Sequence, residues 1–110
     1  MGIFRLRALS HLDVSHNRLT SLDGVGRALK LRYLDVSYNR LRELAEEVTS
    51  LLMLKHLDMS FNRVGTLPEH FGVLTQLRHL DLSHNRIDAL PNERFDVLAN
   101  VLVGPPRRTL

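Results

Sequence analysis

The sequence predicts an α/β repeat protein, a solenoid with a parallel sheet on its concave side and short helical or irregular connectors on its convex side. Two observations predict this fold class. First, one pattern occurs four times in register: LSHLDVSHNRLTSL at 9–22, LRYLDVSYNRLREL at 31–44, LKHLDMSFNRVGTL at 54–67 and LRHLDLSHNRIDAL at 77–90. Second, its asparagine recurs every 22 or 23 residues, which is the length of one supersecondary unit in a solenoid.

The first half of each repeat predicts a short strand. In LRYLDVS the apolar Leu34 and Val36 alternate with the polar or amphipathic Tyr33, Asp35 and Ser37, and this period of two places the leucines on one face. The other repeats alternate in the same way, so four strands should stack in parallel. Their central leucines should form one buried column: Leu12, Leu34, Leu57 and Leu80.

The second half of each repeat predicts a turn and then a connector. Ser and Asn in S-x-N favour turns and bond nearby backbone amides. A leucine then recurs at the same place in each repeat, at 22, 44, 67 and 90, and it should turn the chain onto the outer, convex face. Apolar residues at every third position of AEEVTSLLML and PEHFGVLTQL indicate short helices or 3₁₀ turns within 45–54 and 68–77.

The pattern L-x-x-L-x-L-x-x-N-x-L resembles the leucine-rich repeat family, of the intracellular type with 22–23-residue units, over roughly residues 3–98. The resemblance implies that the repeated asparagine faces inward and bonds the main chain of neighbouring coils. This structural ladder should comprise Asn17, Asn39, Asn62 and Asn85. The segments LP and LDLSHNRI are similar to segments of Ras-binding scaffolds and of the repeat regions of Roco-type GTPase proteins. The segment SLDGVGRAL resembles phosphatase-regulating repeats.

The repeats divide the chain into a solenoid at 1–103 and a disordered basic tail at 104–110, where Gly and two prolines oppose regular structure. The solenoid should hold a partial repeat at 1–8 and four repeats at about 9–30, 31–53, 54–76 and 77–99. Neither end shows an obvious polar cap, so we expect a fragment of a longer solenoid, able to self-associate through its uncapped ends. Alternatively, VLANVLV at 97–103 covers the last coil.

Composition narrows the function classes. The chain of 110 residues is 44% hydrophobic, which suits one domain with a modest core. It has no cysteine, so disulfides and thiolate zinc sites are excluded, and a reducing, cytoplasmic location is expected. The net charge of +3 is spread over all repeats and there is no Trp, which argues against nucleic acid as a partner. No apolar run is long enough for a membrane span.

Three columns of polar and aromatic side chains should lie on the concave face. One column holds the aspartates Asp13, Asp35, Asp58 and Asp81. Beside it stand His11, Tyr33, His56 and His79, and further outward His16, Tyr38, Phe61 and His84. Histidine beside aspartate could serve a metal or a general base. However, these residues recur by duplication and no copy stands apart, so we predict no catalytic, metal or cofactor-binding residue. The recurring arginines, at 18, 40, 63 and 86, are interpreted as balancing the aspartates.

Two functions remain. The first is a noncatalytic protein-interaction module or scaffold that binds a protein partner through its concave face, as the resemblance implies. Its expected partner-binding residues are Tyr33, Tyr38, His56, Phe61, His79, His84, Asp35, Asp58 and Asp81. The second is a regulatory repeat fragment of a larger signalling enzyme, such as a GTPase, a kinase or a phosphatase-regulating assembly. Neither resemblance names the partner, and no nucleotide-binding or nucleophile motif occurs in the sequence.

Overall fold

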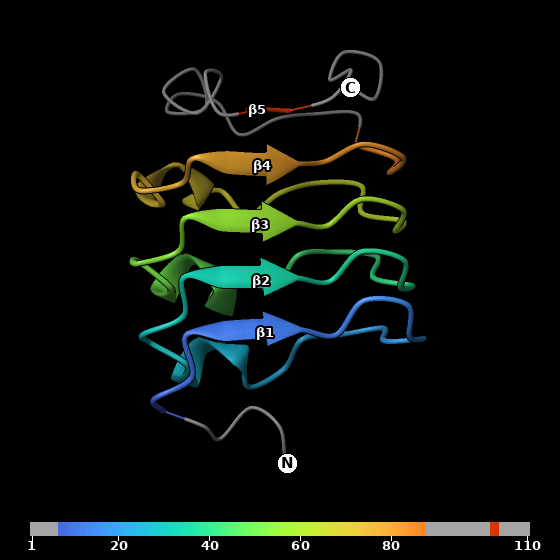
Figure 1. Ribbon diagram of the computed structural model, residues 1–110. Coiled ribbons are helices and arrows are strands. Elements are labelled where there is room, and N and C mark those ends of the chain that lie inside the picture. Colours follow the sequence, from blue (N-terminus) through green and yellow to red (C-terminus); the bar gives the residue numbers. More distant parts are fainter. Residues whose placement is uncertain (1–6, 88–101, 104–110) are drawn as a thin grey trace.

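The structure, a computed structural model, describes residues 7–87 and the backbone of residues 102–103. Five strands form one parallel sheet in sequence order (Figure 1): β1 (His11–Asp13), β2 (Tyr33–Asp35), β3 (His56–Asp58), β4 (His79–Asp81) and β5 (Leu102–Val103). The expectations for most of the partial repeat at 1–8, for the end of the fourth repeat from residue 88, including its leucine at 90, and for the tail at 104–110 fall outside the described residues.

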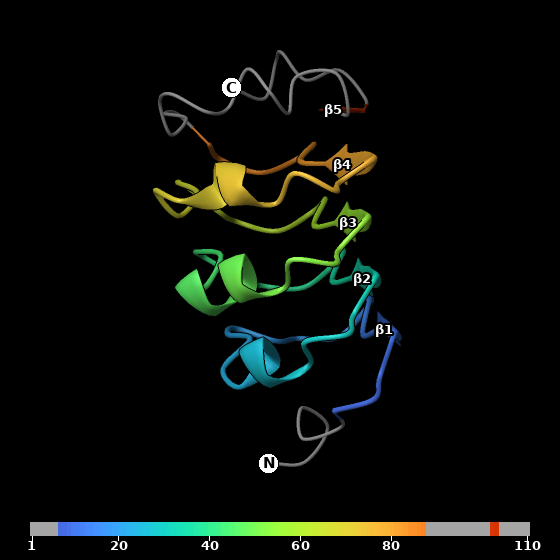
Figure 2. The same cartoon turned by 90° about the vertical axis from the view of Figure 1, so that its left-hand side faces the viewer.

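Within residues 7–87, three short 3₁₀ helices lie opposite the sheet, one in each of the first three repeats (Figure 2): η2 (Val25–Arg27), η3 (Glu46–Ser50) and η4 (Phe71–Val73). Their hydrogen bonds span three residues, as in the bond of 3.0 Å from the amide of Val48 to the carbonyl of Ala45. The sequence predicted short helices in the second and third connectors, and both are present. The α/β leucine-rich solenoid predicted from the sequence is confirmed.

The register joins equivalent residues of successive repeats. Leu34 pairs with Leu12 on one side and with Leu57 on the other, and Leu57 pairs in turn with Leu80. The predicted leucine column is therefore present. Three of its members are fully buried, whereas Leu12, on the first strand, is half-buried. Each repeat thus contributes one inward leucine to the same column.

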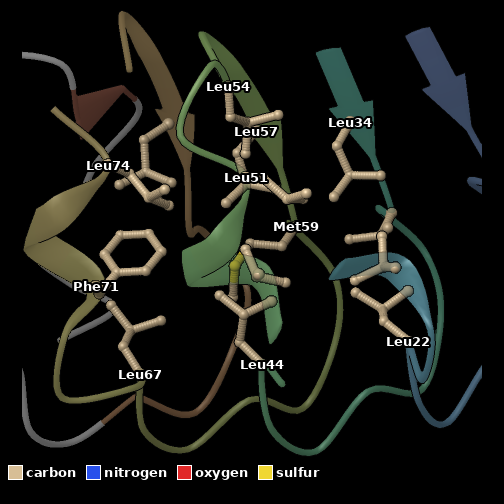
Figure 3. Close-up of a cluster of buried hydrophobic side chains, with 14 of the residues drawn as sticks. Leu22, Leu34, Leu44, Leu51, Leu54, Leu57, Met59, Leu67, Phe71 and Leu74 are labelled. Carbon is tan, nitrogen blue, oxygen red and sulfur yellow. The ribbon is translucent and has the colours of Figure 1, made fainter. Parts of the chain in front are cut away.

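The core fills the space between the sheet and the 3₁₀ helices. Figure 3 shows Phe71 on η4 within a cluster of buried leucines and Met59. Phe71 is completely buried and occupies the place that Val48 holds one repeat earlier. Truncating a buried Phe to Ala typically costs about 3–5 kcal/mol. The solenoid is therefore held together by apolar side chains that each repeat shares with its neighbours.

A fifth strand was not indicated by the sequence pattern. Leu102 of β5 pairs with Leu80 of β4, and Val103 pairs with Asp81. The repeat motif ends before these residues, because LDxSxN does not recur after 77–90. A parallel ladder requires only main-chain donors and acceptors, so the sheet can continue where the side-chain motif does not.

A carboxylate links two neighbouring connectors. The side chain of Glu47 on η3 accepts hydrogen bonds from the amide of Gly24, at 3.0 Å to each oxygen, and from the amide of Gly26 at 2.9 Å. These two amides lower the pKa of Glu47 below its ordinary 4.5, the bond from Gly24 contributing most. A Cβ on Gly26 would lie 3.0 Å from the Cβ of Glu47, so a larger residue there would force Glu47 to shift by a few tenths of an ångström.

Candidate protein-binding surface

The repeated asparagine connects one coil to the coil before it. The side-chain amide of Asn62 donates to the carbonyls of Val36, at 3.0 Å, and of Met59, at 3.2 Å. Its side-chain oxygen accepts from the amide of Leu41 at 3.0 Å. Val36 and Leu41 belong to the preceding repeat, and Asn62 is buried. The asparagine therefore satisfies main-chain groups that the turn leaves without partners.

The bonding differs along the ladder. Asn39 bonds the carbonyl of Val14 and the amide of Leu19, and Asn85 makes the equivalent bonds to the repeat before it. Among the described residues, Asn17 bonds only carbonyls of its own repeat, those of Val14 and Ser15, and its side chain is exposed. These contacts fit the structural role that the resemblance implied for the later three asparagines.

Each strand ends in an aspartate that fixes the following serine. The Oδ1 atom of Asp58 accepts from the amide of Ser60 at 3.0 Å and from its hydroxyl at 2.7 Å. The same pair of bonds is repeated at Asp13, Asp35 and Asp81. In the first repeat, the Ser15 hydroxyl and then its amide lower the pKa of Asp13, against a smaller opposite effect of burial. The aspartate column thus shapes the turn that follows the strands.

The residue after each serine has a left-handed backbone although it is large. His16, Tyr38, Phe61 and His84 have φ between 57° and 58°. This conformation costs a residue with a Cβ about 1–2 kcal/mol. Cross-repeat bonds hold it in place, since the amide of Tyr38 donates to the carbonyl of Ser60 at 3.0 Å and the amide of Phe61 donates to that of Ser83 at 3.1 Å. The left-handed turn points these four side chains outward, while the side chain of the next residue, asparagine, bonds the main chain.

The four outward rings stack on one another, and we call them the turn ring column: His16, Tyr38, Phe61 and His84. The centroids of Tyr38 and Phe61 lie 4.3 Å apart with an angle of 8° between the ring planes. The other two pairs in this column lie 4.3 and 4.1 Å apart. All four residues are exposed, and Tyr38 and Phe61 keep 44% and 39% of their surface accessible. Tyr38 and Phe61, which are stacked on both faces, therefore present ring edges rather than ring faces to solvent.

A second stack, the strand ring column, runs along the strands themselves: His11, Tyr33, His56 and His79. The rings of His56 and His79 lie 4.1 Å apart and are parallel to within 1°. Burial lowers the pKa of His56 below 6.5, and the neighbouring His79 lowers it further, whereas Asp58 and Asp35 act in the opposite direction. Burial, and then the charge of Asp35, raises the pKa of Tyr33 above 10.0. This column is less exposed than the turn ring column.

A shallow, open hollow of about 470 Å³ lies beside the turn ring column. It is lined by Asn17, Arg18, Tyr38, Asn39, Arg40, Phe61, Asn62, Arg63 and His84. The arginines were interpreted from sequence as partners of the aspartates and were not included in the expected binding residues. In the structure the aspartates are bonded to serines, and the exposed Arg18, Arg40 and Arg63 line the hollow with the rings.

The structure thus brings the expected binding residues together on one face. Stacking itself was not predicted, although rings at the same place in four consecutive repeats are a signal for it. Within residues 7–87, no group of three or more His, Asp or Glu side chains is arranged to hold a metal ion. None of the described helices is long and apolar enough to cross a membrane.

Comparisons with known proteins agree with this geometry. A family described as "Leucine-rich repeat region" matches residues 3–101. A Leptospira interrogans LRR protein superposes with a TM-score of 0.82 at 29% identity, covering 90% of this chain and 25% of that one. The functional domain of InlJ from Listeria monocytogenes, which includes a cysteine ladder, has a TM-score of 0.67 at 30% identity, covering 74% of this chain and 17% of that one. The chain therefore spans a minor part of either neighbour. No curated protein matches the sequence.

Proposed function

The chain belongs to the leucine-rich repeat family, and on this premise we propose that it is a noncatalytic module that binds a protein partner through the concave face of its sheet. The surface of contact comprises the turn ring column, the strand ring column and the half-buried Asp35, Asp58 and Asp81 between them. The family is generally noncatalytic and typically binds proteins. The proposal includes a cytoplasmic location, which the absence of cysteine favours.

One observation supports this proposal above the others, namely the exposed stack of Tyr38 and Phe61 on strained backbone. Large rings at a left-handed position cost folding energy, and the same turn could be made by Asn or Gly at lower cost. Backbone strain of this kind is concentrated at functional sites. Interface hot spots are enriched in Tyr, and they are anchored by rigid rings surrounded by polar groups.

The remaining binding residues fit the same surface. His56 and His79 lie in the strand ring column, and Asp58 stands at the end of the same strand as His56. A face that carries aromatic and charged groups in repeating columns suits an extended partner that crosses several repeats. Self-association through the ends of the stack, expected from the sequence, stays a prediction.

Affinity capture with the full chain as bait tests the proposal. The double variant Tyr38→Ala/Phe61→Ala should lose a captured protein, because truncating a good anchor costs about 2 kcal/mol or more of binding. The matched control is Leu29→Ala/Leu52→Ala, which removes two exposed apolar side chains from the connectors, where they are 56% and 54% accessible. This control should keep the captured protein. If both variants recover it equally, the assignment of the sheet face is wrong.

A further inference from the structure

We propose that the hollow beside the turn ring column binds an acidic protein segment, whose Asp or Glu carboxylates face Arg18, Arg40 and Arg63. This inference rests on the proposed function and adds the chemical class of the partner. It assigns a role to the three arginines, which the expected binding residues did not include. The hollow spans three repeats, because Arg18, Arg40 and Arg63 occupy equivalent positions in them.

The charge of the hollow is positive. Its lining contains three arginines and no aspartate or glutamate. In each repeat the aspartate stands three residues before the turn ring residue and the arginine two residues after it, and only the arginines line the hollow. Exposed guanidinium groups at each repeat offer paired N–H donors that match carboxylates in geometry. An acidic segment that runs across the repeats therefore meets one arginine per coil.

The rings favour the same class of ligand. An aromatic ring is electrostatically negative on its faces and positive at its edge. In the turn ring column the faces of Tyr38 and Phe61 are turned toward neighbouring rings, at centroid distances of 4.1–4.3 Å. The edges that remain accessible attract oxygen atoms with partial or full negative charge. Ring edges and arginines thus act together on carboxylates.

The same geometry disfavours single-stranded nucleic acid as the ligand. Proteins that bind such strands stack bases on open aromatic faces. Here the faces of the two central rings are already covered on both sides by the column itself. Phosphates could still contact the arginines, so an oligonucleotide is the necessary comparison in the test.

Fluorescence anisotropy with the full chain and a labelled decaglutamate peptide tests the inference. We expect binding that weakens with salt, since exposed charges are screened within about 8 Å at physiological ionic strength. Arg40→Glu/Arg63→Glu should weaken it at least about tenfold, and Arg40→Gln/Arg63→Gln should give a smaller loss. The control Arg32→Glu/Arg78→Glu makes the same change of net charge immediately before the strands, where both residues are exposed, and should stay within about threefold.

Three results would overturn the inference: no binding of decaglutamate, equal losses in the two charge-reversal variants, or tighter binding of decauridylate than of decaglutamate. Circular dichroism of every variant establishes that these exposed substitutions leave the fold intact. Failure here differs from failure of the proposed function. If decaglutamate does not bind while a captured protein still depends on Tyr38 and Phe61, only the acidic class of partner is wrong.

Discussion

The ring of Tyr38 stacks on the ring of Phe61, at a centroid distance of 4.3 Å, while the backbone of both residues is left-handed. The parallel register places equivalent residues of adjacent coils above one another, and the left-handed turn directs both of these rings outward. An aromatic pair contributes about 0.5–1.5 kcal/mol beyond burial of its area. Stacking along the column therefore offsets part of the cost of the backbone.

We expect the free energy of unfolding of Phe61→Gly to equal that of Phe61→Ala or to exceed it by up to about 1 kcal/mol. Both variants remove the same ring contacts, but only glycine relieves the left-handed backbone. At the exposed Val73 on η4, where the backbone is not left-handed, Val73→Gly should instead be less stable than Val73→Ala by roughly 0.5–1 kcal/mol. Urea unfolding of the four variants measures both differences. A clear advantage of Ala at position 61 would contradict the assigned backbone cost.

Asn62→Ala should destabilise the fold more than Asn17→Ala. The first substitution leaves the buried amide of Leu41 without its partner, at a cost of about 1–3 kcal/mol, and removes one of the two side-chain donors to the carbonyl of Val36. The exposed Asn17 bonds only its own repeat within the described residues, so its loss should cost less. Arg63→Ala should fall within about 0.5 kcal/mol of the original chain. Equal shifts of the urea midpoint for the two asparagine variants would refute the cross-repeat ladder.

The repeat pattern predicted the fold well because its cause is local. The alternation around Leu34 and the spacing of Val48, Leu51 and Leu54 depend only on which faces are apolar. Strand β5 could not be predicted, because its pairing with β4 uses the main chain and needs no motif. The turn ring column and the arginine-lined hollow depend on a left-handed turn whose residues, such as Phe61, are not those that usually mark one.

Acid should weaken the link between the first two connectors. In the folded chain the pKa of Glu47 lies below 4.5, so its carboxylate contributes stability that is fully present above about pH 4.5 and is lost as the pH falls through the folded pKa. Glu47→Gln should therefore cost about 1–2 kcal/mol at neutral pH and reduce the decline of stability in acid. The exposed neighbour Glu46→Gln is the control. Urea midpoints at neutral and acidic pH measure both effects, and an unchanged pH dependence in Glu47→Gln would contradict the assigned role.

The stacked pair of His56 and His79 in the strand ring column should also make stability depend on pH. The pKa of His56 lies below 6.5 in the folded chain, so the unfolded chain binds more protons, and stability should fall as the pH drops below about 6.5. His79→Phe keeps a stacked ring but removes its charge, and it should raise the pKa of His56 while burial keeps it below 6.5. NMR titration of His56 measures the change. A pKa above 6.5 in the original chain would show that Asp58 and Asp35 outweigh burial.

The most direct test of the central claim, that the exposed turn ring column anchors a protein partner, is the dissociation constant of a captured protein measured by calorimetry. Tyr38→Ala/Phe61→Ala should weaken binding at least about 30-fold, which corresponds to about 2 kcal/mol. Circular dichroism should stay unchanged, and Leu29→Ala/Leu52→Ala should bind as the original chain does. An affinity for the ring variant within about twofold of the original, or an equal loss in the connector variant, would contradict the claim.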